Sequence, residues 1–307
     1  MSSDVRIGIS GWRYAPWRGD FYPEGLTQKR ELAFASRAVN SIEINGSFYA
    51  LQTPQRYASW GADVPDDFVF SIKAPRFITH VKRLREIEEP LANFLASGLF
   101  QLRHKLGPIL WQFPPSFTFD ATLFDEFLRQ LPRDSSGAKR IARHCSARLQ
   151  QEGYLDIPSG QPMRHAVEIR NVSFLTPAFI ELLRHYDVAL VVADTADKWP
   201  YVEDLTADFI YMRLHGDKKL YSSGYSDAAL ERWRERIELW RHGKQPGDAH
   251  LVKQRGGSGR RSRDIYCYFD NDVKVRAPYD ARHLLEKLGL ADALDAVPGR
   301  LQEGIPG

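Results

Sequence analysis

Eight short apolar or alternating segments recur along the 307-residue chain, and their arrangement constrains the fold more than any other feature. No two neighbouring segments are joined by a turn of hairpin length, and most gaps carry a helical pattern instead. Strands that alternate with helices pair in parallel, so the sequence predicts an α/β fold. The predicted strands are Val5–Ser10, Ser41–Asn45, Phe68–Lys73, Pro108–Phe113, His165–Arg170, Val188–Asp194, Phe209–His215 and Ile265–Asn271.

The gaps between these strands place apolar residues at helical spacing. Ala228–Arg241 is strongly amphipathic, and Leu91–Lys105 repeats leucine, with Gly107 placed to cap its end. Only Thr195–Asp208 shows little helical pattern. The other predicted helices are Leu26–Val39, Leu123–Leu131, Pro177–Tyr186 and Ala281–Leu288.

Eight such units predict a closed (β/α)8 TIM barrel, formed as a single domain over residues 1–307. The rival fold, an open doubly wound sheet, needs a G-x-G-x-x-G turn after the first strand, and GISGW at residues 8–12 does not match it. Two connections, 133–164 and 243–264, are longer than a barrel requires. Both lead from a helix into a strand, so we expect them at the N-terminal face, opposite the catalytic end of such a barrel.

Composition excludes several classes of protein. The chain is 43% hydrophobic and 26% charged, without an apolar run long enough to cross a bilayer, so no membrane partner is expected. Its start shows no signal-peptide pattern, and Cys145 and Cys267 are too few for a disulfide framework or a cysteine-rich zinc site. We therefore expect a cytoplasmic protein; the oligomeric state is not constrained. The net charge of +3 does not by itself indicate nucleic acid, and the basic run 253–263 is expected to be a solvated loop.

Polar residues gather late in seven of the strands, whereas the earlier positions are apolar. A barrel with a filled core and a functional mouth has this distribution, and a buried structural ion-pair network is the alternative. A buried carboxylate is costly without a partner, so we expect Glu43 to pair with Lys73 of the next strand and Glu168 with Arg170 on its own strand face. The late positions are Glu43, Asn45, Lys73, Gln112, Glu168, Arg170, Asp194, Arg213, His215, Asp270 and Asn271.

The predicted strand-to-helix loops combine aromatic rings with cations, a mixture that suits flat rings beside negative charge, as in nucleotides or sugar phosphates. Phe21, Tyr22 and Phe117 are expected only to pack these loops onto the barrel. The remaining loop residues of this kind are Trp12, Tyr14, Phe48, Tyr49, Arg76, Phe77, His80, Lys82, Arg83, Arg85, Lys218, Lys219, Tyr221 and Tyr225.

Seven motifs occur in the order seen in the YecE-like family, a group called domain of unknown function 72. They are GISGWRYAPWRGDFYPEGL, EINGSFY, PDDFVFSIKAPRFITH, KLGPILWQFPPSF, AVEIRN, YMRLHG and YFDNDVKVRAPYDA. The resemblance extends from Ile7 to Leu288, with Ser47 where the family usually has threonine, and it implies a TIM barrel without an established activity. Barrels of similar shape include a zinc-dependent apurinic endonuclease, which is an analogy of fold alone.

Three chemical interpretations remain open. The first is metal-assisted hydrolysis of a phosphodiester or sugar phosphate, with Mg²⁺, Mn²⁺ or Zn²⁺ on Glu43, Glu168, Asp194 and His215, although no H-x-x-x-H or H-E-x-x-H spacing occurs. The second is metal-free glycoside chemistry by Glu43 and Glu168. The third is binding of an anion or nucleic acid without catalysis.

We favour an enzyme that acts on a phosphate-bearing small molecule or nucleic acid. The candidate catalytic residues are Glu43, Glu168, His215, Asp194 and Lys73. The candidate substrate-binding residues are Trp12, Tyr14, Asn45, Phe48, Tyr49, His80, Gln112, Arg170, Arg213 and Asn271.

Overall fold

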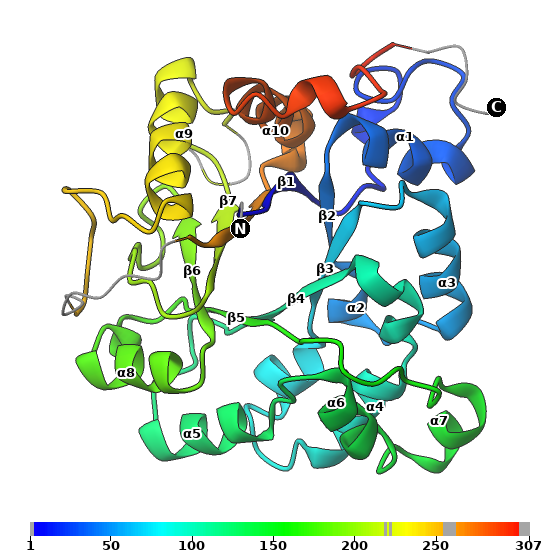
Figure 1. The fold of residues 1–307 in the computed structure, drawn as a ribbon, viewed down its shortest axis with the longest axis vertical. Coiled ribbons are helices and arrows are strands. Elements are labelled where there is room, and N and C mark those ends of the chain that lie inside the picture. The colour runs from blue at the N-terminus through cyan, green and yellow to red at the C-terminus, as the bar shows by residue number, and fades with distance from the viewer. Residues whose placement is uncertain (1–2, 218–219, 221–222, 254–261, 301–307) are drawn as a thin grey trace. The chain divides into compact units, whose positions relative to one another are not determined.

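A computed structural model describes residues 3–217, 220, 223–253 and 262–300. Its strands form a closed parallel barrel in the order β1-β2-β3-β4-β5-β6-β7-β8, with helices between them, which confirms the predicted TIM barrel. The strands are β1 Val5–Ser10, β2 Ser41–Ile44, β3 Val69–Lys73, β4 Leu106–Gln112, β5 His165–Glu168, β6 Ala189–Asp194, β7 Phe209–Leu214 and β8 Asp264–Phe269 (Figure 1).

The chain divides into two compact units, Met1–Glu43 with Ala189–Gly307 and Ile44–Val188. In the first unit, β1 pairs in parallel with β2 and β8, and β7 pairs with β6 and β8. In the second unit, β4 pairs in parallel with β3 and β5. These registers place Ser10 beside Glu43 and Gln112 beside Glu168, at the C-terminal ends of their strands. The expectation of a single domain stays a prediction.

Helices of the first unit cover its strands with apolar side chains. Helix α9 buries Leu230, Trp233, Ile237 and Trp240 on one face, as its spacing predicts, and α10 packs against α9 and β1 (Figure 1). The α-helices are α1 Glu31–Ala38, α9 Asp227–Arg241 and α10 Arg276–Lys287. The 3-10 helices are η1 Ala15–Trp17, η2 Gln28–Arg30, η6 Asp272–Lys274 and η7 Ala291–Ala293.

The connection from β6 to β7 contains no helix, as the weak pattern of Thr195–Asp208 predicts. Two buried carboxylates hold it against the connection that precedes β8. Glu203 accepts a hydrogen bond from the backbone N–H of His250 at 3.0 Å, and Asp204 accepts hydrogen bonds from the backbone N–H groups of Val252 and Lys253. Residues 254–261 of the basic run 253–263 lie outside the described residues, as do Lys218, Lys219 and Tyr221.

Helices of the second unit include two that form the long connection 133–164. These two, α6 and α7, lie against α4 (Figure 1). The α-helices are α2 Gly46–Tyr49, α3 Pro54–Asp63, α4 Glu88–Ala96, α5 Ala121–Gln130, α6 Ser135–Ala142, α7 Ala147–Glu152 and α8 Pro177–His185. A π-helix, η3 Phe77–Val81, and two 3-10 helices, η4 Leu99–Lys105 and η5 Val172–Phe174, complete the unit.

The prediction of one helix over Leu91–Lys105 is wrong. Helix α4 ends at Ala96, because Gly98 takes a left-handed conformation with φ 109°, and a Cβ there would lie 2.4 Å from Pro54 Cα. Gly107 does not cap a helix but lies in β4, where a Cβ would lie 2.6 Å from a side-chain carbon of Val69. Close backbone approach, rather than helix termination, requires glycine at that position.

Helix α3 is absent from the sequence prediction because it buries only Pro54 and Tyr57 along its length. A helix with so few buried residues produces no apolar stripe to detect. Its start was nevertheless readable, since Thr53 accepts a hydrogen bond from the N–H of Arg56 and a proline follows directly.

Within the described ranges, no helix is long and apolar enough to cross a membrane. Both cysteines, Cys145 and Cys267, are free thiols with buried side chains.

His165 is a buried histidine that the fold of the second unit keeps neutral. Its Nδ1 accepts a hydrogen bond from Trp111 Nε1 at 3.1 Å, so its Nε2 carries the proton and donates to Pro132 O at 2.7 Å. Burial lowers the pKa of His165 from 6.5 to about 4. Protonation of Nδ1 would therefore break its hydrogen bond from Trp111.

We expect acid to destabilise the protein through His165. Its pKa is lower in the folded than in the unfolded state, so the unfolded chain takes up the proton first as the pH falls from 6.5 to about 4. The free energy of unfolding should fall by about 3 kcal/mol from this group. Urea denaturation at several pH values measures this, and His165→Gln should flatten the dependence, whereas His185→Gln, at an exposed site, should not. Equal slopes for all three proteins would contradict the assignment.

Candidate functional site

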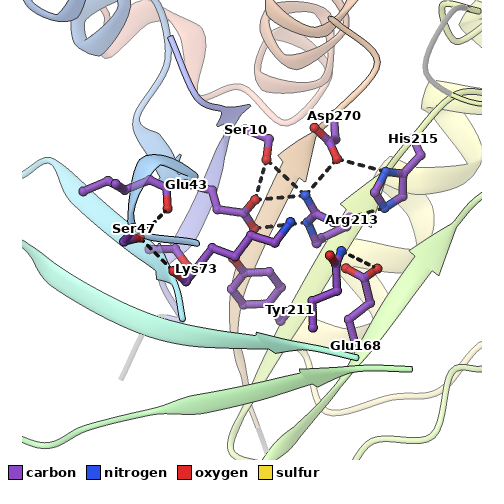
Figure 2. Close-up of polar contacts among 12 residues, drawn as sticks. Ser10, Glu43, Ser47, Lys73, Glu168, Tyr211, Arg213, His215 and Asp270 are labelled. Atoms are coloured by element: carbon purple, nitrogen blue, oxygen red, sulfur yellow. Dashed lines mark hydrogen bonds and ion pairs between the residues drawn. The ribbon is translucent and has the colours of Figure 1, made fainter. Parts of the chain in front are cut away.

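A buried arginine organises the strand ends of the first unit. Arg213 of β7 has no exposed side-chain surface, and its Nη2 lies 3.0 Å from Glu43 Oε1 while its Nε donates to Glu43 Oε2 at 3.1 Å. Tyr211 donates a hydrogen bond to the same carboxylate at 2.6 Å, and the Ser10 hydroxyl donates a short one (Figure 2). Glu43 is therefore fully buried and bonded on both oxygens.

The second carboxylate of this cluster comes from the end of β8. Asp270 Oδ2 lies 2.8 Å from Arg213 Nη2, the nitrogen that also contacts Glu43, and 3.1 Å from His215 Nδ1 (Figure 2). Arg213 Nη1 lies 3.4 Å from His215 Nε2, so that nitrogen accepts from the guanidinium. Two carboxylates thus face one guanidinium, and this cluster has no excess of positive charge with which to attract an anion.

Two further candidate residues of the first unit belong to a neighbouring hydrogen-bond network. Asp194 accepts from Tyr225 OH at 3.1 Å, and burial raises the pKa of Asp194 above its ordinary value. Asn271 donates to Asp280 at 2.8 Å and to the backbone oxygen of Ser223. Both candidates therefore fasten the loops that follow β7 and β8 to the body of the unit.

Glu168 is the buried carboxylate of the second unit. Its Oε1 accepts hydrogen bonds from Gln112 Nε2 at 2.9 Å and from Arg170 Nε at 2.8 Å (Figure 2 draws Glu168). The register of β4 with β5 places Gln112 beside it, and Arg170 follows two residues later, as predicted. The predicted burial of Glu43 and Glu168 is confirmed, since neither is exposed.

Lys73 extends from the end of β3 over an aromatic ring. Its Nζ lies 4.3 Å from the centroid of the Phe48 ring, and the edge of His80 contacts that ring at a centroid distance of 5.1 Å. The position of Phe48 follows from α2, because the Ser47 hydroxyl donates to the backbone oxygen of Lys73 at 2.7 Å and lies 3.1 Å from that of Ile44. The half-buried Asn45 begins this short helix.

The pKa of His80 depends on the charged residues at these strand ends. The pKa of His80 is lowered from 6.5 to about 4, first by burial and then by the charges of Lys73, Arg76 and Arg170, against the opposing effect of Glu168. The ring is therefore neutral at pH 7. Its Nδ1 lies 2.8 Å from the Thr79 hydroxyl, and in the described part of the chain Nε2 has no hydrogen-bond partner.

The aromatic residues predicted to stack on a ligand differ in exposure. Trp12 is 7% exposed, and the half-buried Tyr14 packs on Trp17 at a centroid distance of 4.6 Å while its hydroxyl bonds to Ser10 O. Stacking of these two rings on a ligand stays a prediction. The exposed rings are Tyr49 at 73% and Phe77 at 48%. Phe21, Tyr22 and Phe117 are buried, as predicted.

Several residues of these clusters are missing from the sequence prediction. Tyr211 precedes Arg213 and His215 by two and four positions, so the alternation of β7 could have revealed it. Ser10 ends β1 and carried a similar signal. Tyr225 and Asp280 lie in a loop and a helix, where no alternation identifies them.

The candidate metal ligands do not form a metal site. Glu43 and His215 are bonded within the Arg213 cluster, Asp194 to Tyr225, and Glu168 to Gln112 and Arg170. Throughout the ranges that the structure covers, no three His, Cys, Asp or Glu side chains are placed to hold one ion. We therefore derive no step through a metal.

The fold and these strand-end clusters define the chain as a (β/α)8-barrel protein with buried ion pairs. It belongs to the family described as Protein of unknown function DUF72, whose model matches residues 6–302. It is 23% identical to UPF0759 protein YunF of Bacillus subtilis over 93% of this chain and 95% of that one. It is 30% identical to UPF0759 protein YecE of Escherichia coli K12, over 37% of this chain and 39% of that one.

Solved structures of the same family share the fold. A DUF72 family protein from Thermotoga maritima superposes with a TM-score of 0.69 at 24% identity, covering 93% of this chain and 99% of that chain. A DUF72 family protein from Enterococcus faecalis gives a TM-score of 0.65 at 17% identity, covering 97% of this chain and 99% of that chain.

We expect the Glu43–Arg213 pair to stabilise the fold. Glu43→Gln keeps the shape of the side chain but removes one counter-charge from a fully buried guanidinium. The free energy of unfolding should fall by about 3 kcal/mol, the lower end of the range for breaking a buried pair, because Asp270 still pairs with Arg213. Chemical denaturation measures the change.

Glu152→Gln is the matched control. It breaks a helix ion pair with Arg148 whose side chains are 63% and 81% exposed, so stability should change by less than about 0.5 kcal/mol. A Glu43→Gln protein as stable as the control would show that the buried pair does not support the fold.

Proposed function

We propose that this protein binds a phosphate-bearing substrate at the C-terminal ends of β3, β4 and β5, in the second unit. The observation that carries the proposal is that Lys73, Arg76 and Arg170 all lie near enough to His80 to lower its pKa, with Lys73 held 4.3 Å from the centroid of the Phe48 ring beside it. Cations that converge at the strand ends of a TIM barrel favour a multiply charged anion. The Arg213 cluster of the first unit, with its two carboxylates, is assigned a structural role instead.

The reaction that this arrangement supports is hydrolysis of a phosphate ester, with His80 as proton acceptor. When Nδ1 donates to the Thr79 hydroxyl, Nε2 holds the lone pair that accepts a proton from water. The water oxygen bonds to phosphorus, the ester P–O bond breaks, and the leaving alkoxide takes that proton back from Nε2. A bound phosphate would neutralise the cations that depress the pKa of His80, and the ring would become a stronger base when substrate is present. Glu168 holds Gln112 and Arg170 in position beside it.

The glycoside alternative has less support. Glu43 accepts hydrogen bonds from Arg213, Tyr211 and Ser10, so both of its oxygens are already engaged by protein groups. The expectation of a cytoplasmic protein is retained with this proposal, since intracellular phosphate esters are abundant and both cysteines are free thiols.

Binding of inorganic pyrophosphate to the whole protein tests the proposed site. Lys73→Met removes one cation but keeps the length of the side chain over Phe48, and it should weaken binding at least about tenfold, the value of one lost charge-assisted hydrogen bond. Isothermal titration calorimetry measures the affinity. Lys29→Met, at an exposed lysine of the first unit, is the control, and equal affinities for the two variants would refute the site.

Sulfate affinity should depend on pH through His80. The free protein has a His80 pKa of about 4, and a bound anion raises it, so the proton and the anion bind cooperatively. Affinity should therefore increase as the pH falls from 6.5 toward 4. The same titration of His80→Gln should lack this increase, whereas His144→Gln, at an exposed histidine of the same unit, should retain it. An increase that survives in His80→Gln would assign it to another group.

A further inference from the structure

The large apolar side chains that the described structure leaves exposed all lie in the second unit. They follow the C-terminal ends of β2, β3 and β5, in the strand-to-helix loops. They are Tyr49 at 73%, Leu51 at 39%, Phe77 at 48%, Val81 at 56%, Val172 at 72% and Leu175 at 38% exposure. Single exposed apolar residues are ordinary, but their confinement to one set of loops indicates a binding surface.

Hydrogen bonds join several of these loops to one another. Arg83 Nη2 donates to Ser116 O at 2.9 Å and connects the loops after β3 and β4. Asn171 Nδ2 donates to Pro115 O at 2.7 Å, and the N–H of Phe119 donates to Ser173 Oγ at 2.8 Å. The loops after β3, β4 and β5 therefore form one connected rim beside the proposed phosphate site.

Tyr49 is linked to that phosphate site through Phe48. The Tyr49 and Phe48 rings meet edge to face at a centroid distance of 5.1 Å, and Lys73 Nζ lies 4.3 Å from the Phe48 centroid. The Phe48 ring thus separates the exposed Tyr49 ring from the buried Lys73 ammonium group. This arrangement suits a nucleotide whose base contacts Tyr49 and whose phosphate contacts Lys73. Exposed Arg76 and Arg85 add positive charge along the loop after β3.

We propose that the substrate held at this site is a single-stranded nucleic acid, one of whose bases stacks on Tyr49 while a backbone phosphate lies at Lys73. The proposal rests on the proposed phosphate site and names the class of substrate it takes. Phe77, next to Arg76 at the start of the π-helix, offers a second ring for a neighbouring base. A sugar phosphate has no flat ring to cover these side chains, and a duplex keeps its base faces stacked inside.

Fluorescence anisotropy of a labelled 20-nucleotide oligothymidylate with the full-length protein tests this proposal. Tyr49→Ala should weaken binding roughly tenfold, and Phe77→Ala by a similar factor, through loss of one stacked base each. Tyr49→Trp should restore the affinity. His185→Ala is the control, because it removes an exposed ring of the same unit at the end of α8, outside these loops, and it should leave binding unchanged.

Five outcomes would overturn the inference. If an abasic strand of the same length bound equally well, base stacking would not contribute to binding. Unchanged affinity in both Tyr49→Ala and Phe77→Ala would lead to the same conclusion. Pyrophosphate binding without oligonucleotide binding would reject the nucleic acid while leaving the proposed phosphate site intact, whereas loss of both would reject both. Binding to phosphatidylserine vesicles that falls in Val172→Ala and exceeds oligonucleotide binding would assign the rim to an anionic membrane.

Discussion

The burial of Arg213 is the interaction on which the first unit depends most. A guanidinium without access to water must be compensated in full, and the two carboxylates of Glu43 and Asp270 supply that compensation from β2 and the end of β8. Tyr211 and Ser10 occupy positions on the Glu43 carboxylate that water would otherwise fill. Three strands and a loop are therefore fixed by the requirements of one side chain.

The two strand-end clusters contain similar residues but differ in how those residues are paired. Around Arg213 two carboxylates face one guanidinium, and His215 lies between Asp270 and that guanidinium. Around His80 three cations lower the pKa of the ring, and Nε2 has no hydrogen-bond partner in the described part of the chain. An internally balanced cluster supports a fold, while an unbalanced one attracts a ligand of opposite charge. The number of polar residues at the strand ends does not distinguish a structural cluster from a ligand-binding one. The way in which those residues pair does distinguish them.

Much of the fold was predictable because it depends on periodicity. Alternation and helical spacing revealed the strands, helix α9 and the burial of Glu43 and Glu168. Contacts between distant segments were not predictable. The cation found on Glu43 is Arg213 of β7, a strand that is not next to β2, while the predicted pairing with Lys73 stays a prediction. The helix break at Gly98 depends on the approach of α3, and the burial of Trp12 depends on how its loop folds. Neither feature produces a local pattern in the sequence.

The hydroxyl of Ser47 has a consequence for how a ligand would be received. By bonding to the backbone oxygens of Ile44 and Lys73, it fixes the short α2 helix to the strand that carries the lysine. Phe48 and Tyr49 follow directly, so their rings are set before any ligand arrives. A preorganised platform loses little conformational entropy on association. Threonine at position 47 would supply the same hydroxyl. Alanine would leave the two rings in place only part of the time, and ligand would then associate more slowly.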